Sequence, residues 1–110
     1  MRQQTEPSGT YRRGVELAEA GRHEEALACF REHLLRHPDS VEGLNDAAAV
    51  LHALGRYDDA IRHLRAAVER GGDGDGHALW NLAETYLAAD RPGEALGLFD
   101  RLRRHRLLGP

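Results

Sequence analysis

The residues best suited to chemistry are Cys29, His33 and His37, which are spaced four apart along one predicted helix. Side chains at i, i+4 and i+8 share a helix face, and thiolate and imidazole groups bind transition metals such as zinc. The same face is predicted to pack inside the protein, and cysteine is among the most buried residue types. We therefore expect no metal, although the spacing leaves metal binding by this stripe open.

Other candidate sites are weaker still. The segment GGDGDG at 71–76 has the Asp-x-Asp-Gly start of a calcium loop but lacks the remaining ligands and the distal Glu. It also lacks the Lys-Ser/Thr of a phosphate-binding loop, so we interpret it as a flexible joint. Serine occurs only at Ser8 and Ser40, and no nucleophile–base pair can be identified. We expect neither enzymatic activity nor a cofactor.

Charge and composition narrow the class of protein further. The chain has 110 residues and a net charge of −3, and all 15 basic residues are arginine, which is typical of a GC-rich bacterial genome. The arginines near the C-terminus lie where cations offset a helix dipole, and without interleaved aromatics they do not indicate nucleic-acid binding. No apolar run suits a signal peptide or a membrane span. With Cys29 the single cysteine, we expect a cytoplasmic protein without membrane contact.

These side chains must be positioned by a repeated unit, because three segments of the chain are similar. They are AGRHEEALACF at 20–30, LGRYDDAIRHL at 54–64 and ADRPGEALGLF at 89–99. Their central alanines, Ala26, Ala60 and Ala95, are 34 and 35 residues apart. This period is typical of stacked helical arrays, in which each unit buries its apolar face against its neighbours.

Helical periodicity, with glycine and proline at the breaks, predicts about six helices in three pairs. We expect a disordered tail at 1–6 and a single domain at 7–110, divided into repeats at about 7–40, 41–75 and 76–109. The second helix of the first two pairs should run from about His23 to Arg36 and from about Tyr57 to Arg70. The helices should cross at two sets of small residues, which are Gly14, Ala48 and Ala83, and Ala26, Ala60 and Ala95.

The unit is a 34-residue helix–turn–helix with these small residues. An aromatic residue such as Phe30 follows the second site by four positions, and Pro38 closes the unit. This pattern resembles the tetratricopeptide repeat. The resemblance covers about 7–107. It implies an all-α, right-handed superhelical α-solenoid that serves as a protein–protein interaction module. Departures from the family pattern are His33 at a usually small position, Asp90 in place of the turn glycine, and Gly72 and Leu107 in place of proline.

The resemblance also implies that the first helix of each pair lines a concave groove that binds a peptide. The groove-facing positions in this sequence are Tyr11, Arg12, Val15, Asn45, Asp46, Ala49, His52, His77, Trp80, Asn81 and Glu84. Trp80 is either a half-exposed anchor for a partner or padding between helices. Asn45 and Asn81 either hydrogen-bond a peptide backbone or are solvated. Asp46 would repel the terminal carboxylate that chaperone-binding repeats clamp.

The C-terminal end raises two alternative functions. Repeat arrays normally end in a polar capping helix, but here we expect Leu98, Leu102, Leu107 and Leu108 to be partly uncovered. One alternative is a scaffold that self-assembles through this uncapped helix into a homo-oligomer. The other is a docking arm of a larger multidomain bacterial enzyme. The sequence names neither the partner nor the pathway.

Overall fold

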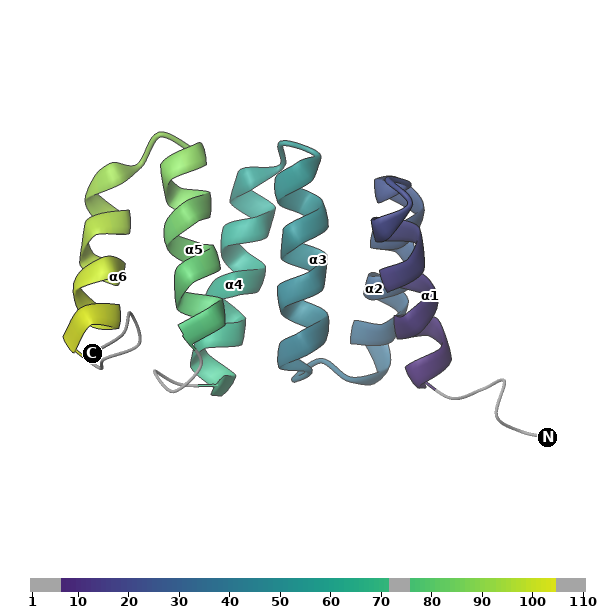
Figure 1. Cartoon of the computed structure of the whole chain (residues 1–110). Coiled ribbons are helices and arrows are strands. Elements are labelled where there is room, and N and C mark those ends of the chain that lie inside the picture. The colour runs from purple at the N-terminus through teal and green to yellow at the C-terminus, as the bar shows by residue number, and fades with distance from the viewer. Residues whose placement is uncertain (1–6, 72–75, 105–110) are drawn as a thin grey trace.

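The structure is a computed structural model that describes residues 7–71 and 76–104. These residues form helices and contain no strand. The helices are α1 (Pro7–Glu19), α2 (His23–Arg36), α3 (Val41–Ala53), α4 (Tyr57–Gly71), α5 (Gly76–Ala88) and α6 (Pro92–Arg104), as Figure 1 shows. The predicted all-α repeat solenoid is therefore confirmed. The tail at 1–6 and the centre of the predicted joint at 72–75 lie outside the described residues, so the exact repeat boundaries stay a prediction.

The turn between the two helices of each pair is the same in all three pairs. Gly21, Gly55 and Asp90 all adopt a left-handed conformation, with φ of 80°, 77° and 63°. In the third turn, Arg91 N donates to Tyr86 O at 2.8 Å and Asp90 N donates to Leu87 O at 3.0 Å. This pair of bonds is a Schellman motif, and equivalent bonds close the other two turns. Asp90 thus departs from the family pattern in residue type but not in geometry.

Small residues allow the helices of a pair to cross closely. Ala26, Ala60 and Ala95 have no exposed surface. A Cβ placed on Gly14 would lie only 2.7 Å from Cε1 of the Phe30 ring. The predicted small-residue sites are therefore places where a larger side chain would overpack the crossing.

The junction between the first two pairs explains why His33 is tolerated at a position that is usually small. His33 is buried, and its Nε2 lies 3.1 Å from Oγ of Ser40. Ser40 is the N-cap of α3 and accepts a hydrogen bond from Gly43 N at 3.0 Å. A Cβ on Gly43 would lie 2.7 Å from Cδ2 of His33. The large side chain of His33 on α2 is thus accommodated because Gly43 on α3 has no side chain.

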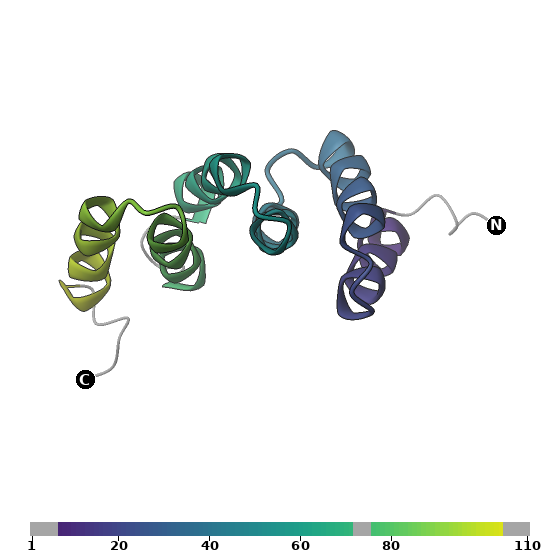
Figure 2. The same ribbon diagram turned by 90° about the horizontal axis from the view of Figure 1, so that it is seen from above.

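The helices are arranged in an arc, as the view from above in Figure 2 shows. Helices α1, α3 and α5 form its inner row, and α2 and α4 lie in the outer row. Each helix packs against the next along the chain, and α3 also contacts both α1 and α5. The described chain is elongated, with extents of 48 × 26 × 22 Å. The first helices of the three pairs therefore share one face, as the sequence predicts.

The C-terminal end differs from the sequence-based expectation. Leu98 and Leu102 are buried, because they pack toward the interior of the repeat, so predicting them to be uncovered was wrong. The exposed leucine of α6 is Leu96, at 68% exposure. Leu107 and Leu108 lie outside the described residues. Among the described helices, none combines the length and apolar character needed to cross a bilayer.

Candidate functional site

Three hollows line the inner face of the arc, and together we call them the groove. The Tyr11 hollow, of about 400 Å³, lies among α1, α3 and the start of α5. The Val15 hollow, of about 320 Å³, lies between α1 and α3, and the His52 hollow, of about 240 Å³, lies between α3 and α5. Nine of the eleven predicted groove residues line them, namely Tyr11, Val15, Asn45, Asp46, Ala49, His52, His77, Asn81 and Glu84.

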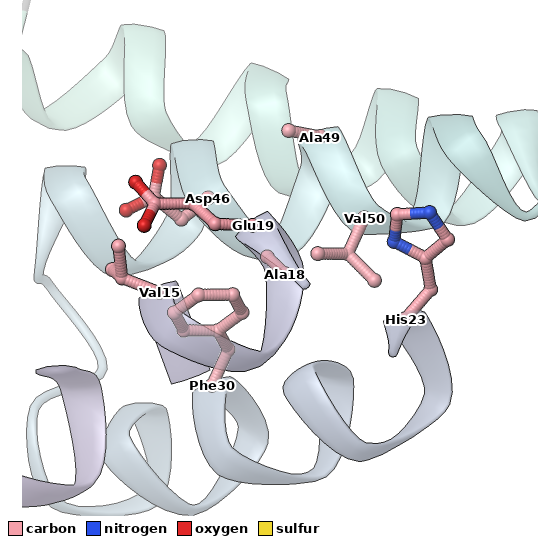
Figure 3. Close-up of a pocket in the computed structure, with 8 residues that line it drawn as sticks. All are labelled: Val15, Ala18, Glu19, His23, Phe30, Asp46, Ala49 and Val50. Atoms are coloured by element: carbon pink, nitrogen blue, oxygen red, sulfur yellow. The ribbon is translucent and has the colours of Figure 1, made fainter. Parts of the chain in front are cut away.

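The Val15 hollow is the most apolar part of the groove. Figure 3 shows Val15 and the Phe30 ring at one end and His23 at the other. Nδ1 of His23 is buried and has no hydrogen-bond partner among the described residues. Ala49 lines both this hollow and the His52 hollow, so it lies where the two meet. A bulky side chain at position 49 would therefore obstruct the centre of the groove.

The Tyr11 hollow carries the acidic side chains Glu42 and Asp46. The Tyr11 hydroxyl donates a hydrogen bond to Oδ2 of Asp46, which connects α1 to α3. Burial, then this hydrogen bond and the negative charges of Asp46 and Glu42, raise the pKa of Tyr11 well above its usual value of 10.0. Tyr11 is therefore a neutral donor at physiological pH.

Asn45 lies in the same hollow and lacks a partner. It is 6% exposed, and its Oδ1 is buried without a hydrogen-bond partner among the described residues. Leaving such an acceptor unpaired costs about 1–3 kcal/mol. The reading of Asn45 as a solvated side chain is therefore wrong, and the site retains an unused polar group.

The His52 hollow is ordered by a hydrogen-bond chain that the sequence analysis missed. Oγ1 of the buried Thr85 donates to Asn81 O at 2.8 Å, and Nδ1 of His52 lies 3.1 Å from the same Oγ1. A hydroxyl has a single proton and a carbonyl only accepts, so His52 must donate from Nδ1 to Thr85. This bond fixes the His52 ring against α5 and joins the second and third repeats.

Two predicted groove residues line none of these three hollows. Trp80 is 39% exposed and packs edge-on against Phe99 of α6, with ring centroids 5.4 Å apart. It therefore partly pads the helix packing while staying partly exposed, and its role as an anchor for a partner stays a prediction. Arg12 is exposed on α1.

The stripe of Cys29, His33 and His37 serves packing in this structure. The His33 ring lies 5.2 Å from the ring of His37 and 5.2 Å from that of Tyr11, and its Nε2 is engaged with Ser40. Across residues 7–71 and 76–104, no three side chains of the metal-binding types come together. The site chemistry of the described residues is therefore that of a hydrogen-bonding and charged surface.

Several groove residues were not predicted from the sequence. Glu19 and Glu42 lie one helical turn from Val15 and Asp46, so the same i, i+4 spacing would have found them. Thr85 lies one turn after Asn81 and could have been found in the same way. His23 carried no such signal, because it follows a turn.

A fourth hollow, of about 610 Å³, lies away from the groove, between α4 and α6. This hollow is larger than each of the three groove hollows, but acidic side chains on its rim form ion pairs with nearby arginines. Glu94 pairs with Arg91, and Asp100 pairs with Arg104 at 3.2 Å. These ion pairs leave less free charge there than the groove presents.

Comparisons with known proteins agree with this architecture. Two family models described as tetratricopeptide repeat match residues 39–107 and 7–32. Protein FlbA of Caulobacter vibrioides is 38% identical over 72 residues, which cover 66% of this chain and 11% of FlbA. Two solved structures of MamA AMB-1 superpose with a TM-score of 0.82 at 19% identity, covering 93% of this chain and 55% and 59% of theirs. A MamA RS-1 double mutant gives a TM-score of 0.80 at 23% identity over 87% of this chain and 53% of its own.

The chain thus spans about a tenth of FlbA and little more than half of these MamA chains. At this identity, the MamA structures show a shared fold. The first family model alone covers more than half of the chain. Repeats of this type are scaffolds for protein–protein interaction, which agrees with a groove that presents hydrogen-bonding groups and charge. From the repeat period, the turn geometry and these matches together, we conclude that the chain belongs to the tetratricopeptide repeat family.

Proposed function

We propose that this chain is a non-enzymatic module that binds an extended segment of a partner protein in the groove formed by α1, α3 and α5. The observation that carries the proposal is that the three hollows share one face and are lined by nine of the eleven predicted residues. Asp46 borders two hollows and Ala49 borders two, so the hollows form a continuous row. A row of apolar and polar hollows suits a segment that inserts alternate side chains.

The test is to select peptides on the protein from a displayed random library and to measure their affinity by fluorescence anisotropy. Ala49→Phe should fill the centre of the groove and weaken binding at least roughly tenfold. Ala28→Phe is the matched control, because Ala28 is also an exposed helical alanine but lies on α2 in the outer row. Its affinity should stay within about twofold of the wild-type value.

The opposite pattern would contradict the proposal. If Ala28→Phe abolishes binding while Ala49→Phe leaves it intact, the interaction surface is the outer face. Circular dichroism of both variants establishes that they are folded before their affinities are compared.

Self-association is a second candidate, and Leu96 is the observation that favours it. This side chain is 68% exposed on the last described helix, where a further repeat would otherwise pack. Sedimentation velocity over a range of concentrations should show a rising mass for the wild type and not for Leu96→Glu. A constant monomer mass at all concentrations would remove this candidate.

The setting of the module is also part of the proposal. Because a related segment occupies 11% of FlbA, we propose a docking arm within a longer bacterial protein as the alternative context. We also propose, as the sequence predicts, that the protein is cytoplasmic and that its partners are neither nucleic acid nor membrane. Peptide selection tests whether the groove binds a peptide.

A further inference from the structure

Charge is distributed unequally between the inner and outer helices. On the outer helices and the linker after α2, most carboxylates are paired with arginine, as in Glu25–Arg22 at 2.6 Å, Glu24–Arg56 at 2.7 Å and Asp39–Arg70 at 2.8 Å. On the inner helices, four carboxylates that line the groove form no ion pair with any described residue. They are Glu19, Glu42, Asp46 and Glu84.

The sequence of the inner helices explains this difference. Helices α3 and α5 carry three carboxylates, Glu42, Asp46 and Glu84, and neither helix contains a lysine or an arginine. The arginines are most numerous on α4 and α6, which carry three each, whereas α1 and α2 carry two each. The two arginines of α1, Arg12 and Arg13, line none of the three hollows. The middle of the groove is therefore an anionic surface whose charge the fold itself does not neutralise.

The Tyr11 hollow concentrates hydrogen-bond acceptors in one place. Glu42 and Asp46 present carboxylate oxygens, and only one of the Asp46 oxygens is engaged, by the Tyr11 hydroxyl. Asn45 adds a side-chain amide. The residue is only 6% exposed, and its amide oxygen has no hydrogen-bond partner among the described residues. Rotation about χ2 of asparagine is broad, so this amide can turn its oxygen toward an incoming donor. The Tyr11 ring supplies an aromatic surface beside these acceptors.

We propose that the partner segment is basic, and that an arginine of the segment enters the Tyr11 hollow and donates hydrogen bonds to Glu42, Asn45 and Asp46. This inference rests on the groove-binding function proposed above. A guanidinium offers five donors in a planar fork, no acceptor and a permanent charge, which complements a hollow of acceptors. It also stacks on aromatic rings such as Tyr11. An acidic or phosphorylated segment would meet like charge at Glu42 and Asp46.

The experiment uses peptides selected from the random library on the wild-type protein. We expect selected sequences to be enriched in arginine. Replacing the arginine by citrulline, a neutral side chain of the same shape, should weaken binding roughly tenfold in anisotropy measurements. Glu42→Gln with Asp46→Asn should produce a similar loss and a weaker dependence of affinity on salt, because both changes keep the shape and remove the charge.

Glu16→Gln is the matched control, since Glu16 is an exposed, unpaired carboxylate of α1 that lines none of the hollows. This variant should bind with wild-type affinity. Equal thermal melts for all variants exclude loss of folding as the cause.

The outcomes separate this inference from the proposed function. Peptides that lose affinity with Ala49→Phe but contain no arginine, or bind equally well with citrulline, would leave the groove function intact and overturn the basic-segment inference. Failure to select any groove-dependent peptide would overturn both. A concentration-dependent mass that disappears with Glu42→Gln and Asp46→Asn would assign the groove to a second copy of the chain, and would also overturn the inference of a foreign segment.

Discussion

The contact between His33 and Gly43 gives a prediction that tests how the first two repeats fit together. A Cβ on Gly43 would lie 2.7 Å from Cδ2 of His33, 3.1 Å from Cδ2 of Leu34 and 3.1 Å from Oγ of Ser40. The His33 ring is buried and its Nε2 is held beside Ser40, so it has little freedom to move away. Gly43→Ala should therefore overpack the junction, although alanine is normally the better helix residue.

The magnitude follows from two opposing effects. Alanine in place of glycine inside a helix gains about 1 kcal/mol from backbone entropy. Overpacking a tight contact costs about 1–3 kcal/mol, so in the wild-type background Gly43→Ala should lower the free energy of unfolding by about 1 kcal/mol. In a His33→Ala background the obstructing ring is gone and the same change should be stabilising by about 1 kcal/mol. The coupling energy between the two sites is then about 2 kcal/mol.

The assay is urea unfolding of the wild type, both single variants and the double variant. Far-UV circular dichroism reports all helices, and fluorescence of Trp80 reports the third repeat. Coincident transitions by the two probes justify a two-state free energy for each variant. The wild-type and His33→Ala backgrounds then give the coupling energy directly.

Equal stabilisation by Gly43→Ala in both backgrounds would refute the reasoning. That result would mean that positions 33 and 43 are not in close contact. The glycine at position 43 of α3 would then not be what accommodates His33 at a position where the family usually has a small residue. A destabilisation of the same size in both backgrounds would instead assign the strain to Leu34 or Ser40.

Three further predictions concern other positions. Ala60→Leu should lower the free energy of unfolding by about 1–3 kcal/mol or more in a thermal melt, whereas Ala28→Leu on the exposed face should change it by less than about 0.5 kcal/mol. Asp90→Gly should raise stability by up to about 1 kcal/mol, because glycine adopts φ of 63° without the steric cost; unchanged urea midpoints would argue against strain there. Burial, and then Arg31, lower the pKa of His63 below 6.5, so the unfolded chain binds more protons and stability falls as pH drops through 6.5. His63→Gln should therefore lose less in Tm than the wild type between about pH 7.5 and about pH 5, and an equal loss would contradict this.

The sequence predicted the parts of the fold that depend on local signals. The bounds of α2, His23–Arg36, follow from the turn glycine before it and Pro38 after it, and both were recognised. The three turns were also predicted, although only the coordinates show that Asp90 adopts the glycine conformation. Local signals of this kind act over a few residues and are therefore readable without tertiary information.

The groove was harder to predict in detail, because its side chains are placed by contacts between repeats. Thr85 and His52 meet across 33 residues of sequence, and Tyr11 and Asp46 meet across 35. The helical spacing of Asn45 predicted its face correctly but not its burial, which depends on the packing of α3 between its neighbours. The same reason explains the error at Leu98 and Leu102, whose burial depends on how α6 lies against the preceding helices.

The polar groups of this chain divide according to the helix that carries them, and this division supports a binding role for the inner face. Most carboxylates of α2, α4 and α6 are paired with arginine, Asp58 being an exception among the described residues, and such exposed pairs add little stability but leave little free charge. The inner helices instead keep Glu42 and Glu84 without an ion pair to any described residue and bury Asn45 with its oxygen unsatisfied, and the unsatisfied oxygen lowers stability. Selection for stability alone would remove the Asn45 penalty and would not account for the row of unpaired carboxylates. Their presence on the one face where the hollows are continuous is the pattern expected of a surface that is completed by a donor-bearing partner.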